Sequence, residues 1–205
     1  ILEDNLRVPS GASYPLSIRD TYRKIYPEFF EKLKIKPIKE YPSMLKESMD
    51  YVNCGGINVV LTPGRFNSAY YEHAYLAKKS GAQLVRNNEL VVQNKILYFK
   101  NYDGKLVRVG AVYRRLDDEF LDPKFFNEES LIGVSGIMEA YLAGNVAIMN
   151  APGNGVADDK GIYYFVPKMI KYYLGEEPIL DNAPTYLPYF EEDKKYFFDN
   201  IEKMV

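Results

Sequence analysis

The chain has one cysteine, one histidine and no tryptophan among its 205 residues. Cys54 has no second cysteine to pair with, so an internal disulfide is excluded, which fits a reducing compartment and leads us to expect a cytoplasmic protein. The lone His73 excludes a metal site built from several histidines of this chain. No run approaches the roughly 18 apolar residues of a membrane-spanning helix, and the charged start ILEDNLRVPS does not fit a secretory signal.

The chain also lacks a strong excess of either charge. Its formal net charge is −2, with 47% hydrophobic and 26% charged residues, a composition typical of globular proteins. We therefore expect neither nucleic acid nor a membrane as a partner, and nothing in the sequence indicates the oligomeric state. Because the first residue is Ile1 rather than Met, we expect a piece of a longer protein.

Residues 57–85 carry the pattern of a strand, a helix and a second strand. INVVLT (57–62) is a short β-branched apolar run, AYYEHAYLAKKS (69–80) has helical spacing, and AQLV (82–85) is again apolar. Asn67 or Ser68 is the expected N-cap of the helix, and Gly81 is its expected end. The pattern predicts a parallel βαβ unit with a right-handed crossover.

Strands broken by tight turns at 93–94 and 103–104 are expected over residues 89–115, as a hairpin or meander inserted into the α/β unit. The fold class is therefore α/β, with a Rossmann-like domain over residues 52–175, a mostly helical N-terminal arm over 1–51, and a connector with a C-terminal helix over 176–205. Further helices are expected over 17–33 (N-cap Ser17, broken at Pro27), 41–52, 134–144 (N-cap Ser135), 160–175 in two parts separated by Pro167, and 189–205.

The first candidate site lies at the start of the chain. Oxygen ligands at alternate positions of an extended segment point to one side, so Glu3 and Asn5 could share a hard cation such as Mg²⁺. Arg7 and the backbone of Ser10 and Gly11 could meet a phosphate or a carboxylate. A frayed, solvated terminus is the alternative, and the spacing alone favours it.

Two further candidates follow predicted strands. Arg65 and Asn67 lie in TPGRFNS, which joins a strand to a helix N-terminus, a place where α/β proteins bind anions, but an ordinary turn explains it equally well. Arg114, Arg115 and Asp117 lie in RRLDD, where both charge signs could orient a polar substrate. The commoner explanation of RRLDD is a set of surface salt bridges.

The loop GNGVADDKG (153–161) is the fourth candidate. Its glycines permit positive φ, and Asp158 or Asp159 can cap the following helix. Lys160 would then lie at a helix N-terminus, where the helix dipole disfavours a cation, a hint that it serves something other than stability. His73 is expected to be a packed imidazole, Cys54 an unactivated thiol, and the Tyr/Phe stripe over 163–173 a part of the core.

Taken together, five blocks resemble the circularly permuted ATP-grasp family, which is related to glutathionylspermidine synthase and is often described only as a domain of unknown function. The blocks follow the family's order from about Glu3 to Tyr186. They are EDNLRVPSGASY, TPGRFNSAYYEHAYLA, YRRLDDEFLDP, GNGVADDKGIYYFVPKMIKYYLGEEPIL and NAPTY.

The resemblance implies an ATP-dependent ligase that activates a carboxylate as an acyl phosphate, which an amine attacks to give an amide. The implied cofactors are ATP and Mg²⁺, and the implied substrates are small-molecule or peptide carboxylates and amines. Glu3 and Asn5 match the family's Mg²⁺-binding pair, and Arg7 with Ser10 and Gly11 the phosphate-proximal stretch. The region 52–175 would be the pre-ATP-grasp domain on the substrate side. Asp159-Lys160 would open the helix that leads from this domain, with Lys160 on the cofactor side.

The sequence also departs from the family pattern. A strand with a Lys and a loop like GGYG are missing, and so is a further metal-binding Asp before Glu3. We therefore expect this chain alone to be inactive. Two other functions stay open: a non-catalytic Rossmann-like binding or interaction module, and a sugar- or nucleotide-binding transferase, for which Asp117-Asp118 is only a loose match.

Overall fold

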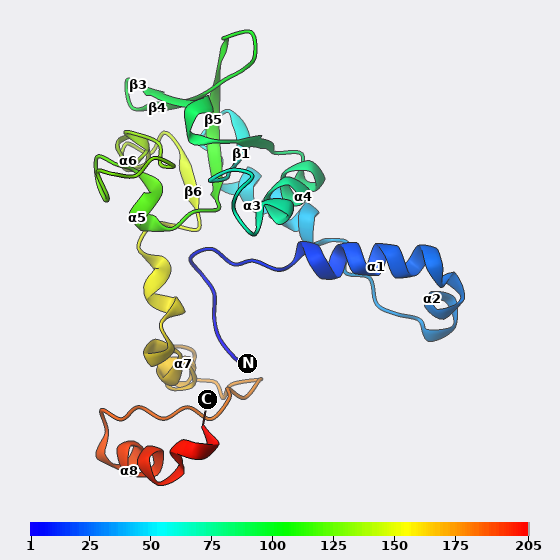
Figure 1. The fold of residues 1–205 in the computed structure, drawn as a ribbon, viewed down its shortest axis with the longest axis vertical. Coiled ribbons are helices and arrows are strands. Elements are labelled where there is room, and N and C mark those ends of the chain that lie inside the picture. Colours follow the sequence, from blue (N-terminus) through cyan, green and yellow to red (C-terminus); the bar gives the residue numbers. More distant parts are fainter. Residues whose placement is uncertain (205) are drawn as a thin grey trace. The chain divides into compact units, whose positions relative to one another are not determined.

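The fold is described from a computed structural model that covers residues 1–204 (Figure 1). The chain forms two compact units. The sheet unit is Val8–Pro152, and the small unit combines Ile1–Arg7 with the residues from Gly153 onward. Each unit is described by itself.

The sheet unit is built on a mixed six-stranded sheet, so the chain is an α/β protein. The strands run in the order β2-β1-β5-β4-β3, and β6 also pairs with β5. Pairings of β1 with β2 and β5, and of β5 with β6, are parallel, whereas β3–β4 and β4–β5 are antiparallel. The strands are β1 (Ile57–Leu61), β2 (Gln83–Val85), β3 (Leu90–Gln93), β4 (Ile96–Lys100), β5 (Leu106–Arg114) and β6 (Ala147–Met149).

The predicted strand–helix–strand unit is confirmed, because helix α4 (Tyr70–Ser80) connects the parallel neighbours β1 and β2. The predicted meander is also confirmed as β3–β4–β5. The long strand β5 joins the two parts, since its first residues pair antiparallel with β4 and its later residues pair parallel with β1 and β6. As a result, the carboxyl ends of β1 and β5 lie together at one edge of the sheet.

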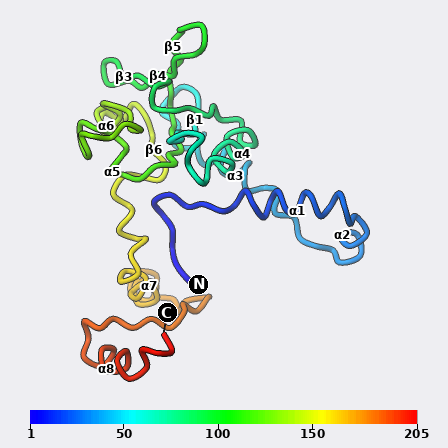
Figure 2. Tube along the Cα trace, in the orientation of Figure 1, coloured from blue at the N-terminus to red at the C-terminus, as the bar shows by residue number. Residues whose placement is uncertain are grey.

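Helices cover both faces of this sheet (Figures 1 and 2). Alternation along β1 explains why: Val59 and Leu61 pack into one apolar cluster, while Val60 between them packs into the other. The larger cluster includes residues of α5 (Asp118–Leu121) and α6 (Ile137–Leu142). The smaller cluster includes residues of α3 (Tyr41–Val52) and α4.

The N-terminal helices begin elsewhere than the sequence predicts. Helix α1 spans Ser13–Ile25, so Ser17 lies inside it and the prediction of an N-cap at Ser17 is wrong. Proline in the first turn loses no hydrogen bond, which is why Pro15 is tolerated there. The expected break is confirmed: Pro27 opens α2 (Pro27–Leu33).

Two helix caps also differ from the sequence prediction. The N-cap of α4 is Ala69, and Asn67 instead accepts the Ala69 N–H through its side chain at 2.9 Å. The N-cap of α6 is Gly136 rather than Ser135, with φ of +83°. Asp122 accepts the N–H groups of Gly136 (3.1 Å) and Met138 (2.9 Å), so a side chain from a distant segment caps α6.

The small unit is organised by α7 (Lys160–Leu174), one continuous helix with Pro167 inside it. The expectation of two helical parts separated at this proline is wrong. Proline has no N–H for the carbonyl four residues earlier, that of Tyr163, and the side-chain amide of Asn182 supplies a donor to it at 3.2 Å. The remaining elements are α8 (Glu191–Asn200) and 3₁₀ turns at Asn87–Glu89, Asn154–Asp158 and Ile201–Lys203.

The aromatic stripe of α7 is mostly not core, contrary to expectation. Tyr163 is buried, but Tyr172 and Tyr173 are 81% and 75% exposed.

Exchanging Asn182 for Ala should lower the free energy of unfolding by about 1 kcal/mol, because the Tyr163 carbonyl loses its donor. In a Pro167→Ala background the helix supplies its own N–H, so the same exchange should cost much less. Urea unfolding of the four proteins in a double-mutant cycle measures this coupling. Equal losses in both backgrounds would show that Asn182 does not substitute for the missing N–H.

Candidate functional site

In the small unit, the loop 153–161 binds the start of the chain. The Asp158 carboxylate accepts the backbone N–H groups of Leu6 (2.6 Å) and Arg7 (3.1 Å) through Oδ1. The side-chain amide of Asn154 donates to the carbonyl of Leu6 at 2.8 Å. These bonds hold residues 3–7 against the loop and argue against the frayed terminus that the spacing alone favours.

Glu3, Asn5 and Lys160 lie together within this unit. The Glu3 carboxylate accepts from the Asn5 amide at Oε1 and from Lys160 Nζ at Oε2, both at 3.1 Å. The hydrogen bond from Asn5 and the pairing with Lys160 lower the pKa of Glu3 below its usual value. The structure therefore brings together the predicted metal pair and the predicted cofactor-side lysine.

The cap of α7 explains how Lys160 is held. Asp159 is the N-cap, as one of the two sequence alternatives has it, and its side chain accepts from Gly161 N (2.7 Å) and Ile162 N (3.2 Å). Lys160 follows it as the first helical residue, where the dipole disfavours a cation. Its ion pair with Glu3 offsets that placement, and both side chains stay largely exposed.

Arg7 packs on the same loop. Its Nε lies 3.6 Å from Asp158 Oδ2. A Cβ added to Gly155 would lie 2.9 Å from Arg7 Cδ, so glycine lets the arginine stem approach the loop backbone. Arg7 thus contacts the same loop that carries Lys160, the partner of Glu3. We call Arg7, Glu3, Asn5 and Lys160 the polar cluster of the small unit.

Glu3 and Asn5 can supply only part of the coordination shell of Mg²⁺, so a metal site here would be open to water and to substrate. Among residues 1–204 there is no group of three or more His, Cys, Asp or Glu side chains that could enclose a metal ion. Mg²⁺, however, is commonly held by one or two carboxylates together with water and substrate phosphates. The Glu3 carboxylate and the Asn5 amide oxygen fit that role, with the cation of Lys160 placed to meet a phosphate.

The sheet unit holds a second candidate site, a cavity of about 280 Å³ at the carboxyl ends of β1 and β5. Its wall combines polar and apolar side chains. Four of the predicted site residues meet here: Ser10, Asn67, Arg115 and Asp117. The rest of the wall comprises Val8, Pro63, Ala69, His73, Leu116, Phe120 and Ile132.

Arg115 and Glu72 form a buried ion pair behind this cavity. Their side chains are each about 1% exposed, and Arg115 Nη2 lies 3.4 Å from Glu72 Oε1. Glu72 also accepts the backbone N–H groups of Gly11 and Ser13, all at 2.9 Å. Glu72 thereby fixes the segment that carries Ser10, and it caps the start of α1 by binding the Ser13 N–H. It also occupies the Gly11 N–H, which the sequence offered as a donor to a phosphate.

His73 contributes a neutral imidazole to the cavity wall. Burial, reinforced by the charge of Arg115, lowers the pKa of His73 to about 4. Its Nδ1 lies 2.8 Å from Thr62 Oγ1. The expectation of a packed imidazole is confirmed. Burial also raises the pKa of Tyr113, whose hydroxyl accepts from Arg115 Nη1, to about 12.

The other two predicted arginines lie apart from this wall. Arg65 is exposed and stacks over Phe66, with its guanidinium carbon 5.0 Å from the ring centre. Arg114 is fully buried, donates to the Asn150 carbonyl at 2.7 Å and pairs with Asp118 at 2.9 Å. The salt bridge expected within RRLDD thus forms between Arg114 and Asp118, but its expected surface location is wrong, because both arginines are buried.

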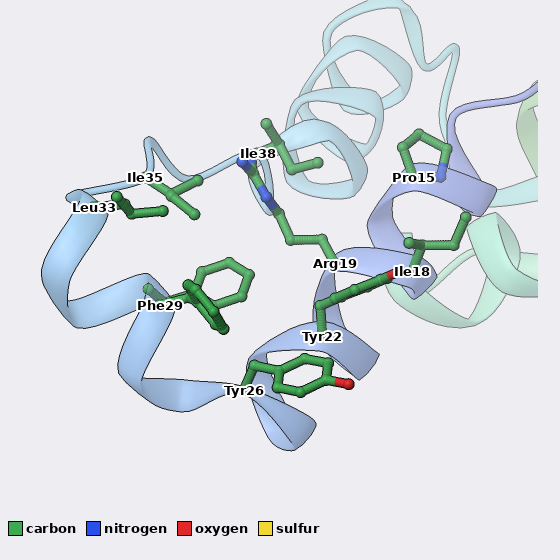
Figure 3. Close-up of a pocket in the computed structure, with 10 residues that line it drawn as sticks. Pro15, Ile18, Arg19, Tyr22, Tyr26, Phe29, Leu33, Ile35 and Ile38 are labelled. Carbon is green, nitrogen blue, oxygen red and sulfur yellow. The ribbon is translucent and has the colours of Figure 1, made fainter.

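An apolar groove of about 730 Å³ lies elsewhere in the sheet unit (Figure 3). It is formed by α1, α2 and the segment that follows them, with Tyr22, Tyr26 and Phe29 on its helical side and Ile35 and Ile38 opposite. Arg19 crosses toward that segment and donates to the Lys36 carbonyl at 2.8 Å. The groove shares no wall residue with the polar cavity.

Comparison with known proteins decides the family. The family model described as "A circularly permuted ATPgrasp" matches residues 1–205. The chain belongs to the circularly permuted ATP-grasp family. The resemblance of the five sequence blocks to this family is thus confirmed.

Relatives cover the whole chain but are much longer. An uncharacterized protein of Synechocystis sp. is 50% identical over 209 residues, which is 100% of this chain and 43% of that protein. An uncharacterized protein of Mycobacterium tuberculosis is 40% identical and is covered over 38% of its length. A Frankia alni protein named "Putative glutamate--cysteine ligase 2-3" is 36% identical, with this chain covering 24% of it. The chain thus spans less than half the length of these relatives.

Across residues 1–204, every helix falls short of the length or apolarity needed to cross a membrane.

Proposed function

We propose that this chain is part of an ATP-dependent carboxylate–amine ligase that forms an amide bond. Membership of the ATP-grasp family supports the reaction class. The observation that carries the proposal is the grouping of Glu3, Asn5, Arg7 and Lys160 in one unit. The family resemblance implies metal binding for Glu3 and Asn5 and phosphate contact for Arg7. The name of the Frankia alni relative, a glutamate–cysteine ligase, supports an amide-forming reaction between small molecules or peptides.

Each residue of the cluster has a proposed role. Glu3 and Asn5 would hold Mg²⁺, which neutralises phosphate charge during phosphoryl transfer. Arg7 and Lys160 would bind phosphate oxygens of ATP, and Arg7 would stabilise the charge that develops there. If a phosphate oxygen of ATP binds the Lys160 ammonium group, the ion pair between Lys160 and Glu3 is broken. The Glu3 carboxylate would then be available as a ligand of Mg²⁺.

The region 52–175 would be the Rossmann-like pre-ATP-grasp domain, preceded by the helical arm 1–51 and followed by the connector 176–205. Its cavity would receive a substrate, with Asn67, Arg115 and Asp117 on the wall. Arg114 would position the end of β5, which carries this wall, through its hydrogen bond to the Asn150 carbonyl. Arg65, in the exposed turn after β1, would contact the substrate from outside the cavity. Because the reaction consumes ATP, we place it in the cytoplasm. Because the relatives are more than twice as long, we propose that residues 1–205 alone are inactive.

Calorimetric titration with Mg·ATP tests the metal and phosphate assignment. A protein extended to the length of the relatives should bind Mg·ATP, and Glu3→Ala or Asn5→Ala should weaken binding at least about tenfold, or 1.4 kcal/mol. Glu177→Ala is the matched control, because Glu177 is also an exposed glutamate of the small unit paired with a lysine, Lys171. It should leave the affinity unchanged.

The same titration can reject the assignment. Unchanged affinity for Mg·ATP in both Glu3→Ala and Asn5→Ala would reject the assignment of these two residues as Mg²⁺ ligands. Comparable binding by the 205-residue chain and the extended protein would show a self-sufficient nucleotide site. Absence of binding in both would argue against the ligase.

The second candidate is a non-catalytic binding or interaction module, and the apolar groove favours it. A groove of this size, with Arg19 on its wall, suits an amphipathic helix of a partner that carries a carboxylate among apolar residues. This module would need no Mg·ATP. Binding of such a helix without Mg·ATP binding would favour it over the ligase.

A further inference from the structure

The apolar groove formed by α1, α2 and the segment after them leaves large apolar side chains exposed. On its wall, Ile18, Tyr22 and Phe29 are 56%, 54% and 52% exposed (Figure 3). Neighbouring apolar side chains that stay in contact with water and are bordered by polar residues mark binding surfaces in soluble proteins. With its volume of about 730 Å³, the groove has room for several large side chains of a partner.

The residues that form this groove carry an excess of positive charge. Residues 13–39, which we call the basic hairpin, include seven Lys or Arg and three Asp or Glu, although the whole chain has a net charge of −2. Within residues 1–204, none of these cations forms an ion pair. Their charge is therefore available to a partner.

Lysines alternate with wall residues along the segment that closes the groove. In KLKIKPIK (32–39), the apolar side chains of Leu33, Ile35 and Ile38 line the groove. The four lysines of the same stretch are exposed and lie outside the wall. A row of lysines thus borders the apolar surface on one side, and a partner that lies in the groove would meet this row with its flank.

Arg19 places one cation on the wall itself. Its Nη1 donates to the Lys36 carbonyl at 2.8 Å, which holds the side chain toward the segment that carries Ile38 (Figure 3). The Arg19 side chain is partly buried. A guanidinium group binds a carboxylate through paired N–H donors, and such charge-assisted bonds are stronger than neutral ones. A carboxylate among the apolar side chains of the partner would therefore complement Arg19.

We propose that the groove binds an acidic amphipathic helix of a separate partner protein. Apolar side chains at helical spacing would fill the groove, and one Asp or Glu among them would pair with Arg19. Further acidic residues on the flank of the helix would face the lysines of residues 32–39. The inference names the partner of the second candidate function, the interaction module, and rests on that function. It does not depend on the ligase.

The charge pattern favours this occupant over three others. Two copies of the chain that met through their grooves would bring two basic hairpins together, and like charges repel. A permanent interface would be more apolar, since lysine is depleted at the cores of such interfaces. A membrane surface is flat, whereas the apolar side chains here line a groove.

Three designed peptides test the charge pattern when they are titrated calorimetrically into the 205-residue chain. Each has about 20 residues, because shorter helices are marginal in water, with leucine at positions i, i+3, i+4 and i+7. The flanks carry Glu in the first peptide, Gln in the second and Lys in the third. The Glu peptide should bind at least about tenfold more tightly than the Gln peptide, and the Lys peptide more weakly than both. In about 1 M salt, where the Debye length is about 3 Å, the Glu and Gln peptides should bind alike.

Two substitutions in the lysine row locate the flank contact. The double variant Lys36→Glu, Lys39→Glu should weaken binding of the Glu peptide at least about tenfold and leave the Gln peptide within about twofold. The matched control is Lys100→Glu with Lys105→Glu, because these lysines are also exposed in the sheet unit and lie outside the groove. It should change neither affinity. Equal losses in the two double variants would contradict the assignment.

An aromatic substitution locates the apolar contact. Tyr22→Ala should weaken both the Glu and the Gln peptide, because Tyr22 lies on the groove wall. Tyr102→Ala is the control, since Tyr102 is an exposed tyrosine of the same unit outside the groove, and it should weaken neither. The peptide series itself needs no substitution, so it tests the inference even if a variant does not fold.

Each alternative occupant has its own signature, and any of them would overturn the proposal. Self-association of the chain that the Glu peptide disrupts would place a second copy in the groove. Tighter binding to phosphatidylserine vesicles than to the Glu peptide would assign this face to a membrane. Loss of Glu-peptide binding in the protein extended to the length of the relatives would assign the groove to another segment of the same protein.

This inference and the proposed functions can fail separately. Equal affinity for the Glu and Gln peptides would keep the interaction module and reject an acidic partner. Absence of binding by all three peptides would reject both. Tyr22→Ala should leave the affinity of the extended protein for Mg·ATP unchanged, because Tyr22 lies outside the polar cluster of the small unit, so the ligase is tested independently.

Discussion

Replacing Glu72 with alanine should lower the free energy of unfolding by about 3–5 kcal/mol, a large share of the roughly 5–15 kcal/mol that typically stabilises a whole domain. The carboxylate pairs with Arg115 and accepts two backbone N–H groups, from Gly11 and Ser13. Its removal leaves a buried guanidinium without its counter-ion and exposes two donors to an apolar interior. Urea unfolding followed by circular dichroism measures the loss.

Two comparisons identify the cause of that loss. Glu72→Gln keeps an oxygen for the two N–H groups but removes the charge, so its effect should be smaller. Glu177→Ala breaks an exposed ion pair with Lys171 and should cost well under 1 kcal/mol. If Glu72→Ala is no more costly than Glu177→Ala, the buried pair does not stabilise the sheet unit.

A double variant separates the ion pair from the backbone contacts. In Arg115→Met, the buried charge is already gone, so Glu72→Gln should then cost less than it does with Arg115 present. The difference is the coupling energy of the pair. A coupling near zero would show that Glu72 acts only through Gly11 and Ser13.

The fold is predictable where the pattern is local. The apolar run of β1, the amphipathic α4 and the turns of the meander each lie within a few consecutive residues, so spacing alone identifies them. Helix ends are less predictable, because distant side chains cap them. Asp122 caps α6, and Asn182 supports the Tyr163 carbonyl inside α7.

The site is predictable to a similar degree. Alternate spacing correctly brings Glu3 beside Asn5. Lys160 pairs with Glu3, and the hint that it serves something other than stability stays a prediction. The assigned roles of these residues stay predictions. Glu72 was missed, because its partners Gly11 and Ser13 lie about 60 positions away and donate only backbone N–H groups. Asp158, weighed only as a helix cap, binds Leu6 and Arg7 across about 150 positions.

Buried charge is the main physical reason for the errors at RRLDD. Composition treats an arginine as a surface residue, since isolated buried charges are costly. Arg114 avoids that cost through the Asn150 and Leu116 carbonyls and Asp118, and Arg115 through Glu72 and Tyr113. Of these partners, Asn150 and Glu72 come from distant segments, and they reach the arginines because β5 pairs with both β6 and β1.

Acid should destabilise the sheet unit through His73. In the folded chain the pKa of His73 is about 4, chiefly because of burial and then because of Arg115, whereas an unfolded histidine titrates near its ordinary value of about 6.5. Between these two values the unfolded state binds more protons, so stability rises with pH. The contribution of His73 is fully present above about pH 6.5 and is lost as pH falls toward 4, by up to about 3 kcal/mol.

Comparing the chain with its His73→Asn variant isolates this effect from the carboxylates that also titrate in acid. Asparagine can keep a hydrogen bond to Thr62 Oγ1 but has no titratable group. Urea unfolding free energies of the two proteins, measured at intervals from pH 7 to pH 4, should therefore converge as the pH falls, with the unsubstituted chain losing more. A histidine that kept its ordinary pKa in the folded state would give parallel curves instead, because folding would then not change its protonation.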